Sequence, residues 1–202
     1  MRQYLFSPRV LIIGVLVALF AAVPAQAATG PIDITECEEG TFTQPFVSFG
    51  DNHYYTLLAG QSSKGFDGTG WELSGGATIV TTTLPDGSTG SVLDLPSGAK
   101  AVSPRTCVMA NYPTARAYVL DVDGNDGVNF QVSYEGRRTW EKPRTTGVLE
   151  GWPESWTAAP VVRLTPPKSV EGWQPMRITL LGNGTEDEYQ VYDLYLDPRL
   201  SH

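Results

Sequence analysis

Charged residues are scarce in this sequence, and basic residues are the scarcer kind. Charged residues form 18% of the 202 residues, whereas soluble domains average roughly 25%. The chain has 14 Lys and Arg against 22 Asp and Glu, so its formal net charge is -8. This acidity argues against nucleic acid and anionic membrane surfaces as partners, because both bind through basic patches. The 21 Gly and 15 Pro argue against a helical bundle and favour a turn-rich β protein.

The motifs of the common enzyme classes are absent. The sequence contains no G-x-S-x-G, H-E-x-x-H, Walker loop or G-x-G-x-x-G pattern. Only His53 and His202 could supply an imidazole, and His53 lies in a stretch with the composition of a turn. Glycoside hydrolysis needs two facing carboxylates, and nothing in the sequence pairs two of the many acids. We therefore predict no catalytic residues.

A single long apolar run occurs, and it lies near the amino terminus. Val10 to Val23 is uninterrupted, Arg2 and Arg9 precede it, and the small residues of Ala25-Gln26-Ala27 follow. This arrangement is typical of a cleaved secretory signal at residues 1–27. The run is short for a membrane span, and an uncleaved anchor is the alternative. We expect a secreted protein that has no membrane contact after cleavage.

Cysteine occurs only twice, at Cys37 and Cys107. An exported chain with an even number of cysteines favours one disulfide, which would close a loop of about 70 residues and contribute roughly 4 kcal/mol. Two free thiols are the alternative. Neither cysteine has a His or a second Cys at ligand spacing, which disfavours a metal site.

The mature chain divides into two parts by composition. Residues 28–60 are rich in aromatic residues without a clean period, and we interpret them as an N-terminal extension. Residues 61–199 form short extended runs separated by Gly, Pro, Asn and Asp, a spacing that predicts an antiparallel β-sandwich. No window shows sustained helical periodicity.

Several strands can be predicted individually. Residues 128–134 alternate apolar and polar side chains, which indicates a strand with one wet face. The preceding run, 117–122, reaches a stretch of turn residues at 123–127, so we expect these two runs to form a hairpin. Further strands are expected at residues 71–73, 93–95, 162–164, 176–180 and 189–197.

Three stretches resemble the galactose-binding-like jelly-roll carbohydrate-binding modules. They are GFDGTGWELSGGA at 65–77, STGSVLDL at 88–95 and YQVYDLYLDP at 189–198. Over roughly residues 36–199 the chain is also similar to a group of secreted proteins from high-GC Gram-positive bacteria, through SPRTCV at 103–108, PTAR at 113–116 and YLDP at 195–198. That second group has no assigned activity to carry over.

The resemblance to the modules implies a fold and a metal. The fold is an all-β jelly roll of two antiparallel sheets with about eight or nine strands. Many relatives hold a structural calcium ion where the terminal strands meet, and the matching acids are Asp67 and Asp193. The sequence departs by placing Asp67 where Glu is usual and Tyr192 where a first Asp is usual. Without the metal, Asp193 could pair with an arginine such as Arg116.

Aromatic residues decide the ligand question, because sugar rings stack on flat aromatic faces. Trp140, in a charged loop, is the best exposed candidate, Trp152 is the second and Tyr134 the third. Trp71 and Trp156 are expected in the core. We predict a secreted, non-catalytic protein that binds a glycan or cell-wall polymer. The alternative is an extracellular structural or protein-interaction protein of the same fold without a sugar site, which a wholly polar sheet face would favour.

Overall fold

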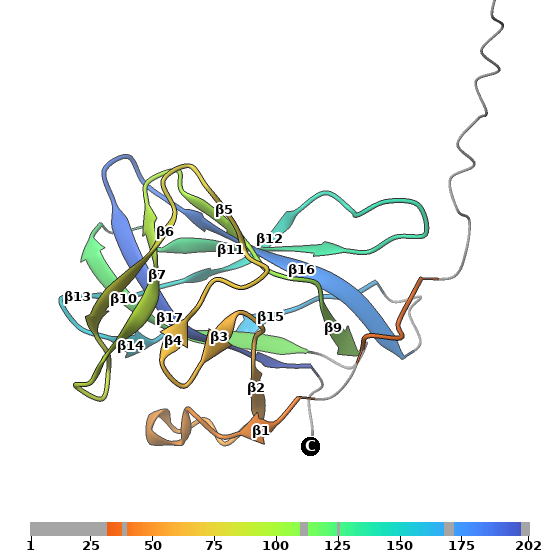
Figure 1. Ribbon diagram of the computed structural model, residues 1–202, viewed down its shortest axis with the longest axis horizontal. Helices are drawn as coiled ribbons and strands as arrows, with labels where there is room; N and C mark the ends of the chain where they lie inside the picture. The colour runs from red at the N-terminus through yellow and green to blue at the C-terminus, as the bar shows by residue number, and fades with distance from the viewer. Residues whose placement is uncertain (1–31, 38–39, 110–112, 125, 168–171, 199–202) are drawn as a thin grey trace, which may run out of the picture.

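Two β-sheets stack face to face in a computed structural model that describes residues 32–37, 40–109, 113–124, 126–167 and 172–198 (Figure 1). The larger sheet contains β1 (Phe42–Thr43), β2 (Tyr55–Leu57), β3 (Gln61–Ser62), β4 (Gly65–Phe66), β6 (Thr78–Thr83), β7 (Thr89–Pro96), β10 (Thr114–Asp123), β13 (Trp152–Pro153), β14 (Thr157–Ala158), β15 (Val162–Arg163) and β17 (Glu188–Asp197). The smaller sheet contains β5 (Glu72–Ser74), β8 (Lys100–Val102), β9 (Thr106–Met109), β11 (Val128–Tyr134), β12 (Arg144–Leu149) and β16 (Trp173–Gly182). A short 3₁₀ turn, Val47–Phe49, precedes β2.

Alternating side chains build the core between the sheets. In β10, Ala115, Ala117 and Val119 are fully buried, and in β11, Phe130 and Val132 are fully buried, while the residues that alternate with them face outward. Successive strand residues point to opposite faces, so each strand contributes every second side chain to the core. The predicted all-β sandwich class is therefore confirmed.

The predicted pairing of residues 117–122 with 128–134 is wrong. β10 lies in the larger sheet and pairs antiparallel with β17, whereas β11 lies in the smaller sheet between β12 and β16. The turn residues after β10 therefore carry the chain from one sheet to the other. Alternation shows which face of a strand is buried, but it does not encode the partner strand, and Greek-key sandwiches place consecutive strands in different sheets.

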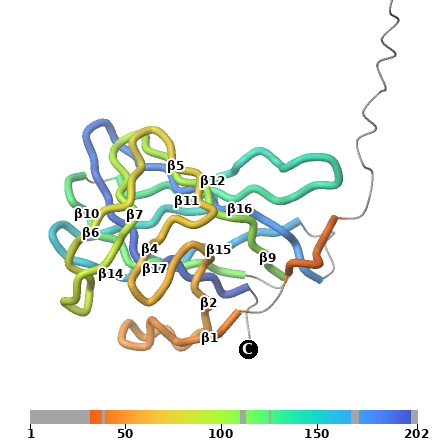
Figure 2. Tube along the Cα trace, in the orientation of Figure 1, coloured from red at the N-terminus to blue at the C-terminus, as the bar shows by residue number. Residues whose placement is uncertain are grey.

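The disulfide between Cys37 and Cys107 is confirmed, with Cα atoms 5.5 Å apart. It ties the segment before residue 38 to β9. Residues 40–57, part of the expected N-terminal extension, run along one side of the molecule into β2, which pairs with β17 (Figure 2). The expected signal peptide, residues 1–27, lies outside the described residues. Among the described residues, no helix has the length and apolar character that a membrane-spanning segment needs.

Candidate functional site

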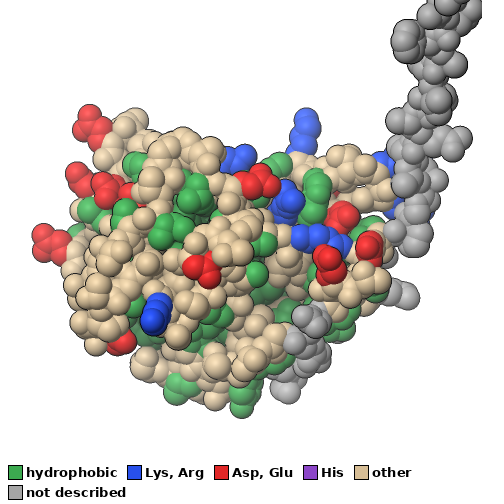
Figure 3. All heavy atoms as spheres, in the orientation of Figure 1, with side chains coloured by type: hydrophobic (Ala, Val, Ile, Leu, Met, Phe, Trp, Pro, Cys, Tyr) green, Lys and Arg blue, Asp and Glu red, His purple; other side chains and the backbone are tan. Residues whose placement is uncertain are grey.

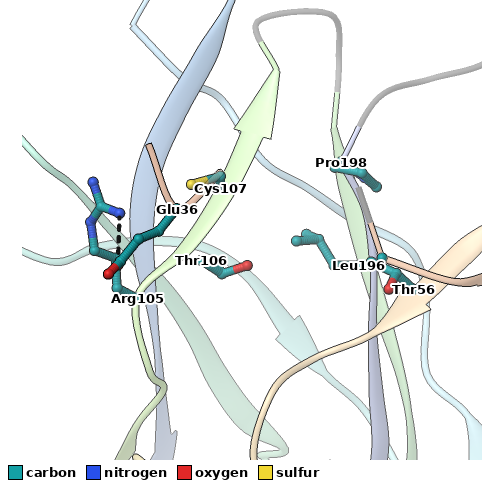
Figure 4. Close-up of a pocket in the computed structure, with 8 residues that line it drawn as sticks. Glu36, Thr56, Arg105, Thr106, Cys107, Leu196 and Pro198 are labelled. Atoms are coloured by element: carbon teal, nitrogen blue, oxygen red, sulfur yellow. Dashed lines mark ion pairs between the residues drawn. The ribbon is translucent and has the colours of Figure 1, made fainter. Parts of the chain in front are cut away.

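A small cavity of about 120 Å³ lies beside the disulfide (Figure 4). Arg105 and Glu36 form an ion pair of 3.7 Å in its wall, and Arg105 also donates to Glu135 at 2.8 Å. The contact of Arg105 with Glu36, its hydrogen bond to the Asp33 carbonyl and the disulfide hold the segment 32–37 against β9. We interpret this cavity as part of the N-terminal attachment.

The outer face of the larger sheet carries a more extensive surface. Arg116 and Tyr118 of β10 point away from the core, and their partners in β17 are Tyr195 and Tyr192. Tyr192 and Tyr195 are three residues apart and would lie on opposite faces of a regular strand. A β-bulge between them turns both outward, because β17 has one extra residue opposite Ala117.

Asp193 forms this bulge and is strained and buried. Its φ of 48° is left-handed, a region that Asp tolerates better than most residues. The side-chain amide of Gln61 bonds both backbone groups of Leu194, the next residue, at 2.9 and 3.1 Å and so holds the bulge in place. Burial raises the pKa of Asp193 to about 6, although hydroxyls of Tyr192 and Tyr195 partly oppose this shift.

Four side chains form a continuous row of rings on this outer face. Trp156 contacts Tyr192 with ring centroids 6.1 Å apart, Tyr192 contacts Tyr118 at 6.2 Å, and Tyr118 contacts Phe49 at 6.0 Å. We call Trp156, Tyr192, Tyr118 and Phe49 the aromatic row. Phe49 is 48% exposed, and the other three are half-buried. Trp156, which we expected in the core, is instead part of the surface and donates its indole N–H to the Thr83 carbonyl.

Trp152 lies on the same face as the aromatic row. Its strand β13 pairs with β10 so that Trp152 is opposite Leu120, which is two residues after Tyr118 and shares its face. The Trp152 side chain is 70% exposed, the highest exposure among the large hydrophobic residues described.

An open cavity of about 470 Å³ adjoins the Phe49 end of the row, and Gly50, Asp51, Asn52, His53, Arg116 and Val161 line it. The buried Asp51 carboxylate accepts from Tyr55 at 2.8 Å, from Arg116 Nη1 at 2.8 Å, and from the backbone and Nδ1 of His53 at 3.1 and 2.8 Å. Burial would raise the pKa of Asp51, but these donors outweigh it and lower the pKa.

Trp140 and Tyr134 belong to the other sheet. Trp140 lies in the hairpin between β11 and β12 and is half-buried, with the Arg177 guanidinium 4.9 Å from its ring centre. Arg177 also pairs with Glu72 at 3.2 Å. Tyr134 is fully buried, so its ring presents no face to a solvent-borne ligand. Neither residue lines either cavity described above.

The expected calcium ligands lie in different surroundings. Asp67 is exposed, and its carboxylate accepts the Thr69 N–H at 2.7 Å, whereas Asp193 is buried beneath tyrosines. Among the described residues, no group of three or more His, Cys, Asp or Glu side chains is placed to hold a metal ion. Calcium prefers six to eight oxygen ligands, so backbone carbonyls would have to complete the shell. Calcium stays a prediction.

No member of the aromatic row was predicted as a binding residue from the sequence. Phe49, Tyr118, Trp156 and Tyr192 come from four separate segments, and no local pattern links them. The alternation of Arg116 and Tyr118 with buried alanines does indicate that Tyr118 faces outward. Charge is also unevenly distributed: Figure 3 shows charged side chains mainly toward the two ends of the face drawn.

The chain matches no protein-family model and no curated protein. The structure is similar to β-sandwich carbohydrate-binding modules. The Clostridium thermocellum xylanase 10B modules CBM22-1 and GH10, complexed with xylohexaose, match with 14% identity over 73% of this chain and 29% of that chain, with a TM-score of 0.50. The C-terminal family 22 module of Clostridium thermocellum Xyn10B matches with 11% identity over 74% of this chain and 96% of that module, with a TM-score of 0.47. The CBM22-1 xylan-binding domain of Paenibacillus barcinonensis Xyn10C matches with 12% identity over 73% of this chain and 94% of that domain, with a TM-score of 0.46. At these identities the likeness concerns the fold alone.

Proposed function

We propose that this chain is a secreted, non-catalytic glycan-binding protein whose binding surface is the outer face of the larger sheet. The aromatic row carries the proposal: four rings in continuous contact extend across one face, with the exposed Trp152 beside them. A glycan chain presents flat C–H surfaces at successive sugar rings, and aromatic faces bury such surfaces with little loss of conformational entropy. An extended row therefore suits a chain better than a single sugar.

The surroundings of the row supply polar partners for sugar hydroxyls. Gln190 and Asp94, paired at 3.3 Å, lie on the same face beyond Tyr192, and Arg116 lies at the other end. A binding surface of this kind combines apolar area with a few placed hydrogen-bonding groups. The matched xylanase structure, which contains a CBM22-1 and a GH10 module, is complexed with xylohexaose, which agrees with a glycan as the ligand.

A binding role without catalysis agrees with the arrangement of acids. Each of the two cavities described is lined by a single carboxylate, Glu36 in one and Asp51 in the other, whereas glycosidases use a facing pair. Asp51 is already engaged by four hydrogen bonds. The disulfide agrees with an oxidising, extracellular location.

Binding of soluble xylan and β-1,4-galactan to Trp156→Ala and Tyr192→Ala tests the proposal, with Trp140→Ala as a matched control on the other sheet. Loss of one stacking aromatic should weaken binding by about 1 to 3 kcal/mol, roughly a fivefold to 150-fold rise in Kd. Trp152→Ala should also weaken binding, with an unchanged melt because the side chain is exposed.

The control separates two locations for the site. If only Trp140→Ala reduces binding, the site lies on the smaller sheet near Arg177, and the aromatic row is not the platform. If the parent protein binds neither polysaccharide nor other cell-wall glycans, the interaction-protein function replaces glycan binding.

A further inference from the structure

The cavity lined by Asp51 and Arg116 continues the aromatic row at one end. Phe49, the last member of the row, precedes Gly50, which lines the cavity. Phe46 packs against both the row and the cavity. Its ring centre lies 5.2 Å from the ring centre of Tyr118 in the row and 4.8 Å from the guanidinium of Arg116 in the cavity wall. A chain lying along the row would therefore place its end, or a side branch, at the cavity.

The one acid that lines the cavity is already neutralised. Asp51 forms an ion pair with Arg116 at 2.8 Å and accepts three further hydrogen bonds. Its oxygens therefore hold Arg116 and His53 in place, and they have little capacity left to accept from a ligand. Of the other acids on this face of β17, Asp193 and Asp197 are buried, and neither they nor Glu188 at the start of the strand lines the cavity.

Donors dominate what remains for a ligand. Among the described residues, Arg116 donates from Nε to the Ala159 carbonyl and from Nη1 to Asp51, and a guanidinium has five N–H groups. His53 donates from Nδ1 to Asp51, so Nε2 of the neutral ring is an acceptor, and its side chain is 49% exposed. Arg163 pairs with Thr114 in strand register, so it lies on the same face as Arg116, next to the exposed Val161.

We propose that this cavity binds the carboxylate of an acidic sugar, a uronic acid residue carried by the glycan that lies along the aromatic row. The inference rests on the proposed function and names its ligand class. Arg116 is held rigid by Asp51, Ala159 and the Phe46 ring, and a preorganised guanidinium suits a planar carboxylate. Arg163 adds further donors on the same face. The protein's net charge of -8 does not oppose this binding at short range, because salt screens distant surface charges.

A matched pair of polymers tests the carboxylate directly. Binding of glucuronoxylan is compared with binding of the same polymer after chemical reduction of its uronic acids to neutral sugars, at fixed ionic strength. The parent should bind the acidic polymer about tenfold more tightly, the effect of one charge-assisted hydrogen bond. Arg163→Ala should reduce that preference and leave binding of the reduced polymer unchanged. The Arg163 side chain is exposed, so this variant should not unfold the protein.

Arg138→Ala is the control for overall charge, because it also removes one positive charge but lies in the hairpin between β11 and β12. An equal loss of preference in Arg138→Ala and Arg163→Ala would overturn the cavity as the site. Equal binding of both polymers, still weakened by Tyr192→Ala, would overturn uronate recognition and leave the aromatic platform intact. Binding of neither polymer would overturn both proposals.

Discussion

Removing the charge of Asp193 should stabilise the protein at neutral pH. The folded structure raises the pKa of Asp193 from its ordinary value of 3.8 to about 6, chiefly through burial. Between these two values the folded state binds more protons than the unfolded state, so stability falls as the pH rises through this window. At about 1.4 kcal/mol per pH unit, the ionised carboxylate costs about 3 kcal/mol above pH 6.

Asn is the substitution that isolates this charge. Asp193→Asn keeps the shape and tolerates the left-handed φ of 48°, and its amide oxygen can still accept the Tyr195 hydroxyl, now 3.3 Å from Oδ2. We expect the variant to be more stable than the parent by up to about 3 kcal/mol at pH 7.5, a rise in Tm of roughly 5 to 10 °C. The advantage should disappear near pH 4.

Urea unfolding of both proteins from pH 4 to pH 8, in chelator, measures this difference. Asp67→Asn is the control, because Asp67 is exposed and the Thr69 N–H lowers the pKa of its carboxyl, so the variant should not be stabilised. An Asp193→Asn variant that is no more stable than the parent at pH 7.5, or whose advantage does not change with pH, would refute the argument from burial.

Three further outcomes are expected. If calcium bridges Asp67 and Asp193, EDTA should lower the Tm of the parent and have no effect on Asp193→Ala; an unchanged parent melt removes the calcium prediction. Non-reducing peptide mapping should recover the peptides of Cys37 and Cys107 linked, and reduction should cost about 4 kcal/mol of stability. Trp71→Ala should lose about 3 to 5 kcal/mol in denaturant unfolding, because Trp71 is 8% exposed and donates to the Ala59 carbonyl at 2.9 Å; a loss below 1 kcal/mol contradicts its core role.

The candidate site could be predicted only in part. Trp152 was recognisable as an exposed aromatic, because Gly and Pro flank it in the sequence. Trp156 was not, since the apolar residues after it resemble the start of a buried strand. His53 and Asp51 looked like an ordinary turn, and only the folded structure brings Arg116 of β10 to within 2.8 Å of Asp51, 65 residues away in sequence.

The sequence by itself determined the all-β class, the buried face of a regular strand such as β11 and the disulfide. None of these properties depends on which distant segments meet in the fold. Alternation within one strand places every second side chain in the core, and two cysteines in an exported chain can form only one bridge. The tertiary structure alone decided that β10 pairs with β17 instead of β11. It also decided that Tyr192 and Tyr195 share a face, because the bulge at Asp193 inserts one residue that changes the alternation. The aromatic row depends on the pairing of β10 with β17 and on the bulge at Asp193, because its rings come from segments that meet only when distant strands pair in that register.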